Sequence, residues 1–106
     1  MANKRIIWST RASRELRQIL EYFNQRNKST RYSLSMLKEI EYLTNNLSKN
    51  ELIGRLTSNK NTRVIQMKVY LIFYEILQDH IQIVSFWDNR QDISKRQKNI
   101  ISVANK

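Results

Sequence analysis

The side chains that could carry acid–base chemistry lie in the second half of the chain. His80 is the only histidine of the sequence, and a histidine pKa can lie near neutral pH, as a general base requires. His80 follows Asp79 at a turn between two apolar runs, a position that favours a surface histidine. Glu75 lies within the first of these runs, where burial could raise its pKa. An outward-facing or arginine-paired carboxylate is the favoured interpretation of Glu75.

The sequence excludes several other kinds of site. It contains no cysteine, so disulfides, zinc–thiolate sites and thiol catalysis are excluded. A single histidine argues against a His-rich metal centre, and we expect no metal and no cofactor. No apolar run approaches the roughly 18 residues that span a bilayer, and the first residues do not resemble a signal peptide. We therefore expect a cytoplasmic protein with no membrane partner.

The charge of the chain points to a polyanionic partner. Nineteen Lys and Arg against 9 Asp and Glu give a formal net charge of +10 at pH 7. A charge tuned only for solubility in a small domain is about 2–8. The charge alone would fit nucleic acid, an acidic protein or an anionic membrane as the partner. Arg11, Arg14 and Arg17 form a basic ridge on one predicted helix. This ridge could bind phosphates or an acidic surface, or could simply be solvated.

The elements that must position these side chains begin with a short strand and two helices. Residues 4–9 predict a strand in which Ile6 and Trp8 share one face. Residues 11–25 and 30–47 predict two amphipathic helices, joined by a short polar segment into an antiparallel hairpin. The apolar stripe of the first helix is Ala12, Leu16, Ile19, Leu20 and Phe23, and that of the second is Tyr32, Met36, Ile40, Leu43 and Leu47.

The second half predicts a sheet. Residues 52–56 form a short extended piece around Gly54, the only glycine, and residues 63–68 form a strand. Residues 70–77 are apolar at nearly every position, which is typical of a central strand covered on both faces. Residues 80–87 complete a hairpin with it, and a short final helix is possible, anchored by Ile93, Ile100, Ile101 and Val103. With 106 residues, the chain predicts one α+β domain spanning residues 1–106.

Aromatic side chains gather in the predicted hairpin. They are Tyr70, Phe73, Tyr74, Phe86 and Trp87. Interleaved with basic residues, such rings could stack on bases. Alternating aromatics in a small sheet are more often core residues, and we predict a core position for Phe73 and Phe86.

Three segments resemble the RelE/ParE superfamily of toxins, also described as plasmid stabilisation proteins. Residues 8–12, Trp-Ser-Thr-Arg-Ala, followed by Leu16 and Ile19, resemble the family's opening segment. Residues 70–76, Tyr-Leu-Ile-Phe-Tyr-Glu-Ile, are similar to its central strand, and Ile81 to Asp92 resembles its closing segment. The segments occur in family order and span residues 6–93.

The resemblance implies both a fold and a biological role. The implied fold is RelE-like: an N-terminal strand, a two-helix hairpin and a mostly antiparallel sheet of three to four strands. The implied role is the toxin of a bacterial type II toxin–antitoxin system, which inhibits growth and is neutralised by a cognate antitoxin, here expected to be acidic. RelE-like members cut messenger RNA on the ribosome, whereas ParE-like members inhibit DNA gyrase and perform no chemistry.

The two branches differ in what they require of the sheet. RNA cleavage needs a base, an acid and positive charge near the phosphate. Arg63 and Arg90 resemble the family's phosphate-contacting arginines, and they are catalytic candidates only if the chain is RelE-like. Glu75 and His80 are weaker ones. No Tyr or His follows Trp87, so the terminal acid of RelE-like toxins is missing from its usual place.

We therefore predict a toxin of the ParE-like branch that targets DNA gyrase. The alternative is a ribosome-dependent mRNA endoribonuclease, so whether the chain is an enzyme stays open. A further alternative is a non-toxic basic module that binds nucleic acid. The cations expected to bind a partner are Arg11, Arg14, Arg17, Arg55 and Lys68.

Overall fold

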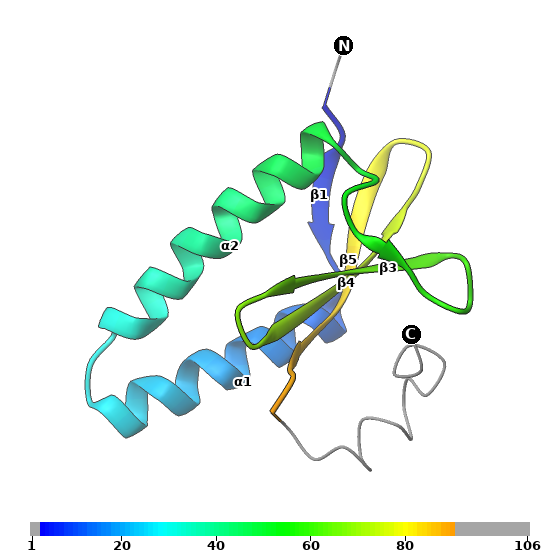
Figure 1. Ribbon diagram of the computed structural model, residues 1–106. Coiled ribbons are helices and arrows are strands. Elements are labelled where there is room, and N and C mark those ends of the chain that lie inside the picture. Colours follow the sequence, from blue (N-terminus) through cyan, green and yellow to red (C-terminus); the bar gives the residue numbers. More distant parts are fainter. Residues whose placement is uncertain (1–2, 91–106) are drawn as a thin grey trace.

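Two helices and one five-stranded sheet make up the part of the protein that the computed structural model describes, residues 3–90. In chain order (Figure 1) the elements are β1 Arg5–Trp8, α1 Thr10–Asn27, α2 Arg31–Lys49, β2 Arg55–Leu56, β3 Thr62–Met67, β4 Tyr70–Ile76 and β5 His80–Asp88. The predicted α+β class and the predicted element order are confirmed. The possible final helix anchored by Ile93 and Val103 lies outside the described residues.

The sheet is mixed, with strand order β1-β5-β4-β3-β2. Strand β4 occupies the centre and pairs antiparallel with β3 and β5, as its continuous apolar run predicts. Strand β1 pairs parallel with β5, in a register that sets Arg5 beside His80 and Trp8 beside Ile83. The sheet has five strands, slightly more than the three to four predicted. The short edge strand β2 lies within the extended piece predicted at residues 52–56.

Ser9 marks the point where β1 ends and α1 begins. Its N–H donates to the carbonyl of Ile83 over 2.9 Å, which closes the parallel pairing. Its hydroxyl accepts from the N–H of Ala12 over 3.0 Å, the hydrogen bond of an N-cap. Helix α1 extends past its predicted end at residue 25, and its last residue is Asn27. The C-cap residue, Lys28, has a left-handed φ of 51°. The polar residues 24–27 extend α1 because they are compatible with a helix.

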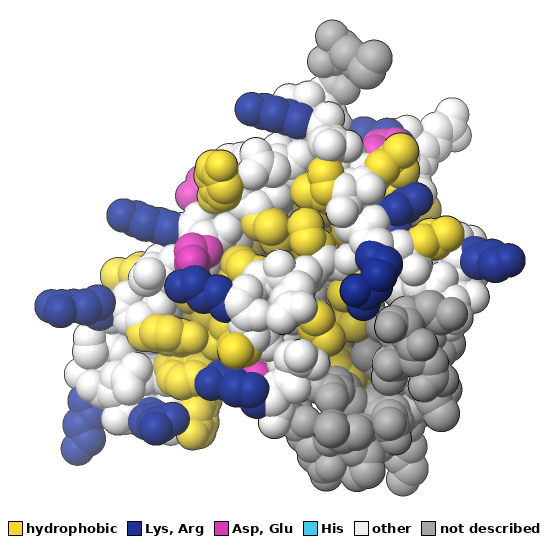
Figure 2. Space-filling view, in the orientation of Figure 1, with side chains coloured by type: hydrophobic (Ala, Val, Ile, Leu, Met, Phe, Trp, Pro, Cys, Tyr) yellow, Lys and Arg dark blue, Asp and Glu magenta, His cyan; other side chains and the backbone are white. Residues whose placement is uncertain are grey.

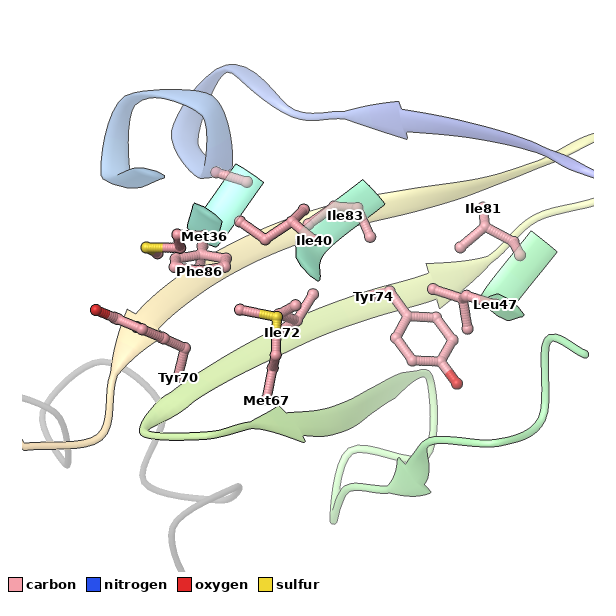
Figure 3. Close-up of a cluster of buried hydrophobic side chains, with 11 residues drawn as sticks. Met36, Ile40, Leu47, Met67, Tyr70, Ile72, Tyr74, Ile81, Ile83 and Phe86 are labelled. Carbon is pink, nitrogen blue, oxygen red and sulfur yellow. The ribbon is translucent and has the colours of Figure 1, made fainter. Parts of the chain in front are cut away.

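The main core lies between the helical hairpin and one face of the sheet. Figure 3 shows Met36, Ile40 and Leu47 of α2 over side chains of β3, β4 and β5. Ile6 and Trp8 of β1 pack against this core from the side, as their shared face predicted. No helix within residues 3–90 is long and apolar enough to cross a membrane.

A second cluster covers the opposite face of the sheet. Its buried members are Val64, Phe73 and Trp87, and Leu71 and Val84 pack against them. The rings of Phe73 and Trp87 meet edge to face with centroids 6.2 Å apart, a favoured geometry for aromatic pairs. Strand β4 is therefore buried on both faces.

Candidate functional site

Arg63 belongs to a hydrogen-bond network at the start of β3. Its Nη1 donates to the carbonyl of Gly54 over 2.7 Å. The N–H of Gly54 donates to the hydroxyl of Tyr74 over 2.8 Å, and this hydroxyl donates to the carbonyl of Glu51 over 2.8 Å. Burial raises the pKa of Tyr74, which keeps its hydroxyl protonated as a donor. Arg63 therefore fixes the segment after α2 to the sheet.

Gly54 is a glycine because the ring of Tyr74 leaves no room for a side chain. A Cβ atom at this position would lie 2.4 Å from the Tyr74 hydroxyl oxygen and 2.6 Å from Cε1. Tyr74 is fully buried, so its ring cannot move aside. The only glycine of the sequence thus serves a close approach between backbone and ring.

Arg90 is held by Asp88 at the end of β5. Its Nε donates to Oδ1 over 3.0 Å and its Nη2 donates to Oδ2 over 2.8 Å, a bidentate ion pair. The hydrogen bonds from Arg90 lower the pKa of the Asp88 carboxyl, and the same bonds raise the pKa of Arg90. The Tyr70 hydroxyl, near the same end of the sheet, lies 2.8 Å from that of Tyr32 on α2. Burial is the largest cause of the raised pKa of Tyr70, and the hydrogen bond with Tyr32 is the second.

The structure places Arg63 and Arg90 at opposite ends of the sheet. Arg63 pairs with Tyr74 across β3 and β4, whereas Asp88, two residues before Arg90, pairs with Tyr70. Tyr70 and Tyr74 are four residue steps apart along β4, which corresponds to about 13 Å. The two arginines that resemble the family's phosphate contacts therefore do not form one site among the described residues.

Glu75 and His80 each contact a neighbouring side chain, as expected of a paired carboxylate and a surface turn histidine. Glu75 is half-buried on β4 and accepts a hydrogen bond from the Thr62 hydroxyl over 3.2 Å. The Nδ1 atom of His80 lies 2.8 Å from Oδ1 of Asp79 at the hairpin turn. This hydrogen bond lowers the pKa of the Asp79 carboxyl. Neither contact brings the residue to Arg63 or Arg90.

The basic residues predicted to bind a partner fall into two groups. Arg11 pairs with Glu15 over 3.2 Å and Lys68 pairs with Glu39 over 3.0 Å. Arg14, Arg17 and Arg55 are exposed and form no ion pair within residues 3–90. Figure 2 shows Lys and Arg side chains spread over this face of the molecule, over both the helices and the sheet.

Glu15 has a role that the sequence did not reveal. Its carboxylate accepts hydrogen bonds from Ser85 Oγ over 2.9 Å, from the N–H of Phe86 over 3.0 Å and from Trp87 Nε1 over 3.1 Å. Strand β1 pairs with β5 only as far as Ile83. Beyond that point Glu15 replaces the missing strand and supplies the acceptor that the β5 edge needs.

Replacing Glu15 with alanine is expected to lower the free energy of unfolding by at least about 2 kcal/mol. The change leaves the buried donors of Phe86 and Trp87 without an acceptor, at about 1–3 kcal/mol each. Urea denaturation followed by circular dichroism measures the loss. Glu21→Ala is the matched control, because Glu21 is exposed on the same helix, and its cost is expected within about 0.5 kcal/mol. Equal costs for the two variants would contradict the role of Glu15.

The aromatic side chains of the β4–β5 hairpin are core residues. Tyr70, Phe73, Tyr74, Phe86 and Trp87 are all buried, so they offer no exposed rings for stacking on bases. The core positions predicted for Phe73 and Phe86 are confirmed. Within residues 3–90, no group of three or more His, Cys, Asp or Glu side chains could hold a metal ion.

Comparison with known proteins agrees with this architecture. A solved structure described as the chromosomal ParDE TA system from P. aeruginosa has a similar fold, with a TM-score of 0.66 and 16% sequence identity. The similarity covers 78% of this chain and 92% of that chain. A search of curated proteins finds no match. The family model for the ParE toxin of the type II toxin–antitoxin system parDE matches residues 6–93. With most of its length matched, the chain belongs to the ParE toxin family, within the RelE/ParE superfamily predicted from its three sequence segments.

Proposed function

We propose that this ParE-family toxin arrests growth by binding DNA gyrase and does not cleave RNA. The observation that carries the proposal is the separation of Arg63 and Arg90. A ribonuclease must direct its cationic donors at one phosphate as charge develops on it. Here the positions that pair with Arg63 and with Asp88, Tyr74 and Tyr70, lie about 13 Å apart along β4. Each arginine already binds an acceptor of the protein itself.

The remaining acid–base candidates support the same proposal. Glu75 is engaged by Thr62, and His80 by Asp79 at an exposed turn. A general base and a general acid must both reach the reacting phosphodiester. The Tyr74 hydroxyl is committed to Gly54 and Glu51. An inhibitor that acts by protein–protein contact needs none of these groups to be free.

We further propose that an acidic antitoxin neutralises this toxin by binding its helical hairpin. The hairpin exposes two cations that form no ion pair within residues 3–90, Arg14 and Arg17, and also two apolar side chains, Leu34 at 57% and Leu37 at 39%. Acidic and apolar residues of one amphipathic segment would satisfy both. The fold is similar to that of a structure described as a ParDE system, which supports an antitoxin partner for this chain.

The decisive experiment measures supercoiling by purified gyrase with and without the chain. We expect supercoiling to stop while primer extension on translated messages shows no new cuts. Arg63→Ala and Arg90→Ala should each weaken inhibition by less than about tenfold, since most single interface residues cost little. Loss of a central electrostatic stabiliser would instead lower a ribonuclease rate by about 10²–10³.

Lys49→Ala is the control for loss of one positive charge, because Lys49 is exposed at the end of α2. Circular dichroism must show that each variant is folded, since Arg63 also fixes Gly54. Ribosome-dependent cleavage by the purified chain that is lost on Arg90→Ala would overturn the proposal in favour of an endoribonuclease.

A further inference from the structure

A row of aromatic rings reaches the surface at the tip of the helical hairpin. The ring centroids of Tyr22 and Phe23 lie 5.0 Å apart, and those of Phe23 and Tyr32 lie 4.6 Å apart. The Tyr32 hydroxyl then contacts that of buried Tyr70 over 2.8 Å. Tyr22 remains 57% exposed and Tyr32 remains 39% exposed. The core thus supports these rings from below while part of each remains accessible to a ligand.

An open pocket lies beside Tyr32. It has a volume of about 440 Å³ and is lined by Asn27, Ser29, Arg31, Tyr32 and Ser35. Ligand pockets commonly measure about 300–1,000 Å³ and combine apolar surface with a few polar groups. These residues carry one aromatic ring, one amide, two serine hydroxyls and one guanidinium. The amide and the hydroxyls can both donate and accept hydrogen bonds.

The same tip is strongly basic. Arg26, Lys28 and Arg31 lie within six residues, and no acidic residue occurs between Glu21 and Glu39. None of the three cations forms an ion pair within residues 3–90. Figure 2 shows hydrophobic and basic side chains side by side over the joined ends of α1 and α2. An anionic ligand would therefore meet charge that no described acidic group neutralises.

We propose that this pocket binds one nucleotide of a single-stranded nucleic acid. Exposed aromatic rings stack on bases, and flanking cations bind the backbone phosphates, which is how sequence-tolerant single-strand binding works. The amide and hydroxyls provide partners for the edge of the base. An acidic protein segment would use the cations but would leave the polar pocket beside the ring unexplained. This inference goes beyond the proposed action on gyrase and does not depend on it.

The test uses the purified full-length chain with short single strands of DNA and RNA that contain 2-aminopurine. Stacking of the base on Tyr32 should quench its fluorescence, and anisotropy of labelled strands gives the affinity. Tyr32→Leu should weaken binding at least about fivefold, the lower range for one stacked base, and should abolish the quenching. Tyr32→Phe should preserve both the affinity and the quenching, because it keeps the ring. Like Tyr32→Leu it loses the hydrogen bond to Tyr70, so it controls for that loss.

Charge is tested with a matched pair of variants. Arg31→Gln should weaken binding and reduce the dependence of affinity on salt, since one phosphate contact is lost. Lys49→Gln removes the same charge from the other end of α2 and should leave affinity within about twofold. Quenching by both DNA and RNA, or by only one of them, supports the proposal. Quenching by only one would show whether the site prefers deoxyribose or ribose.

Three results would overturn the proposal. The first is a normal affinity and no change in quenching for Tyr32→Leu. The second is an equal loss for Arg31→Gln and Lys49→Gln, which indicates unspecific attraction to net charge. The third is displacement of the strands by poly-glutamate with the same dependence on Arg31, which would assign the surface to an acidic protein.

Discussion

Replacing Phe73 with alanine is expected to lower the free energy of unfolding by about 3–5 kcal/mol, the usual cost of truncating a buried aromatic side chain. Phe73 is 2% exposed at the centre of β4. It packs edge to face on Trp87 and belongs to the cluster on the sheet face opposite the main core. A cavity there would remove contacts from both Val64 and Trp87. Denaturant unfolding followed by circular dichroism gives the change directly.

Tyr42→Ala is the control for removal of an aromatic ring. Tyr42 is 72% exposed on α2, so its loss should change stability by less than about 0.5 kcal/mol. Phe73→Leu should cost less than Phe73→Ala, because it preserves most of the buried volume. A cost below about 1 kcal/mol for Phe73→Ala would contradict the burial of this face of β4.

The elements of this fold could be predicted from periodicity because each buries a continuous stripe or face. The stripe containing Met36, Ile40 and Leu47 became the core face of α2. The continuous apolar run of residues 70–77 correctly predicted a central strand buried on both faces. Hydrophobic burial determines these patterns, and burial is what the sequence displays.

Interactions between distant residues could not be predicted in the same way. The parallel pairing of β1 with β5 joins Arg5 to His80, and no local pattern specifies such a partner. The three hydrogen bonds that Glu15 accepts from β5 depend on where β1 ends. Gly54 was predicted in an extended piece, but the tight contact with Tyr74 that requires a glycine depends on the folded sheet.

The candidate site divides along the same line. The residue types of Arg63 and Arg90 suggested phosphate binding, but the sequence could not show that Gly54 and Asp88 already engage them. Tyr32 was predicted as part of the apolar stripe of α2. It does contact core residue Tyr70, yet it stays 39% exposed beside the pocket. A residue at the end of an amphipathic stripe can serve both core and surface, and periodicity does not separate the two.

Production of this chain alone is expected to arrest bacterial growth, and co-production of a small acidic protein encoded in a neighbouring reading frame is expected to restore it. Membership of the ParE toxin family motivates the first expectation, and the net charge of +10 motivates the second. The complex should bury more than about 2,000 Å², because a partner segment that folds on binding covers a large surface. Growth curves measure arrest and rescue, and the heat-capacity change of binding, measured by calorimetry, reports the buried area. Normal growth with abundant soluble toxin would contradict toxicity.

The rate at which the antitoxin is captured should depend steeply on salt. Electrostatic steering raises association rate constants to about 10⁸–10⁹ M⁻¹s⁻¹ at low salt, against about 10⁵–10⁶ M⁻¹s⁻¹ for neutral surfaces. Between about 0.01 M and about 1 M salt the Debye length falls from about 30 Å to about 3 Å, so the rate should fall at least about tenfold.

The double variant Arg14→Gln and Arg17→Gln should slow association at low salt and match the unmodified chain at high salt. This follows because the two side chains are exposed and unpaired within residues 3–90. An association rate independent of salt would show that the apolar side chains of the hairpin, and not its charge, govern capture.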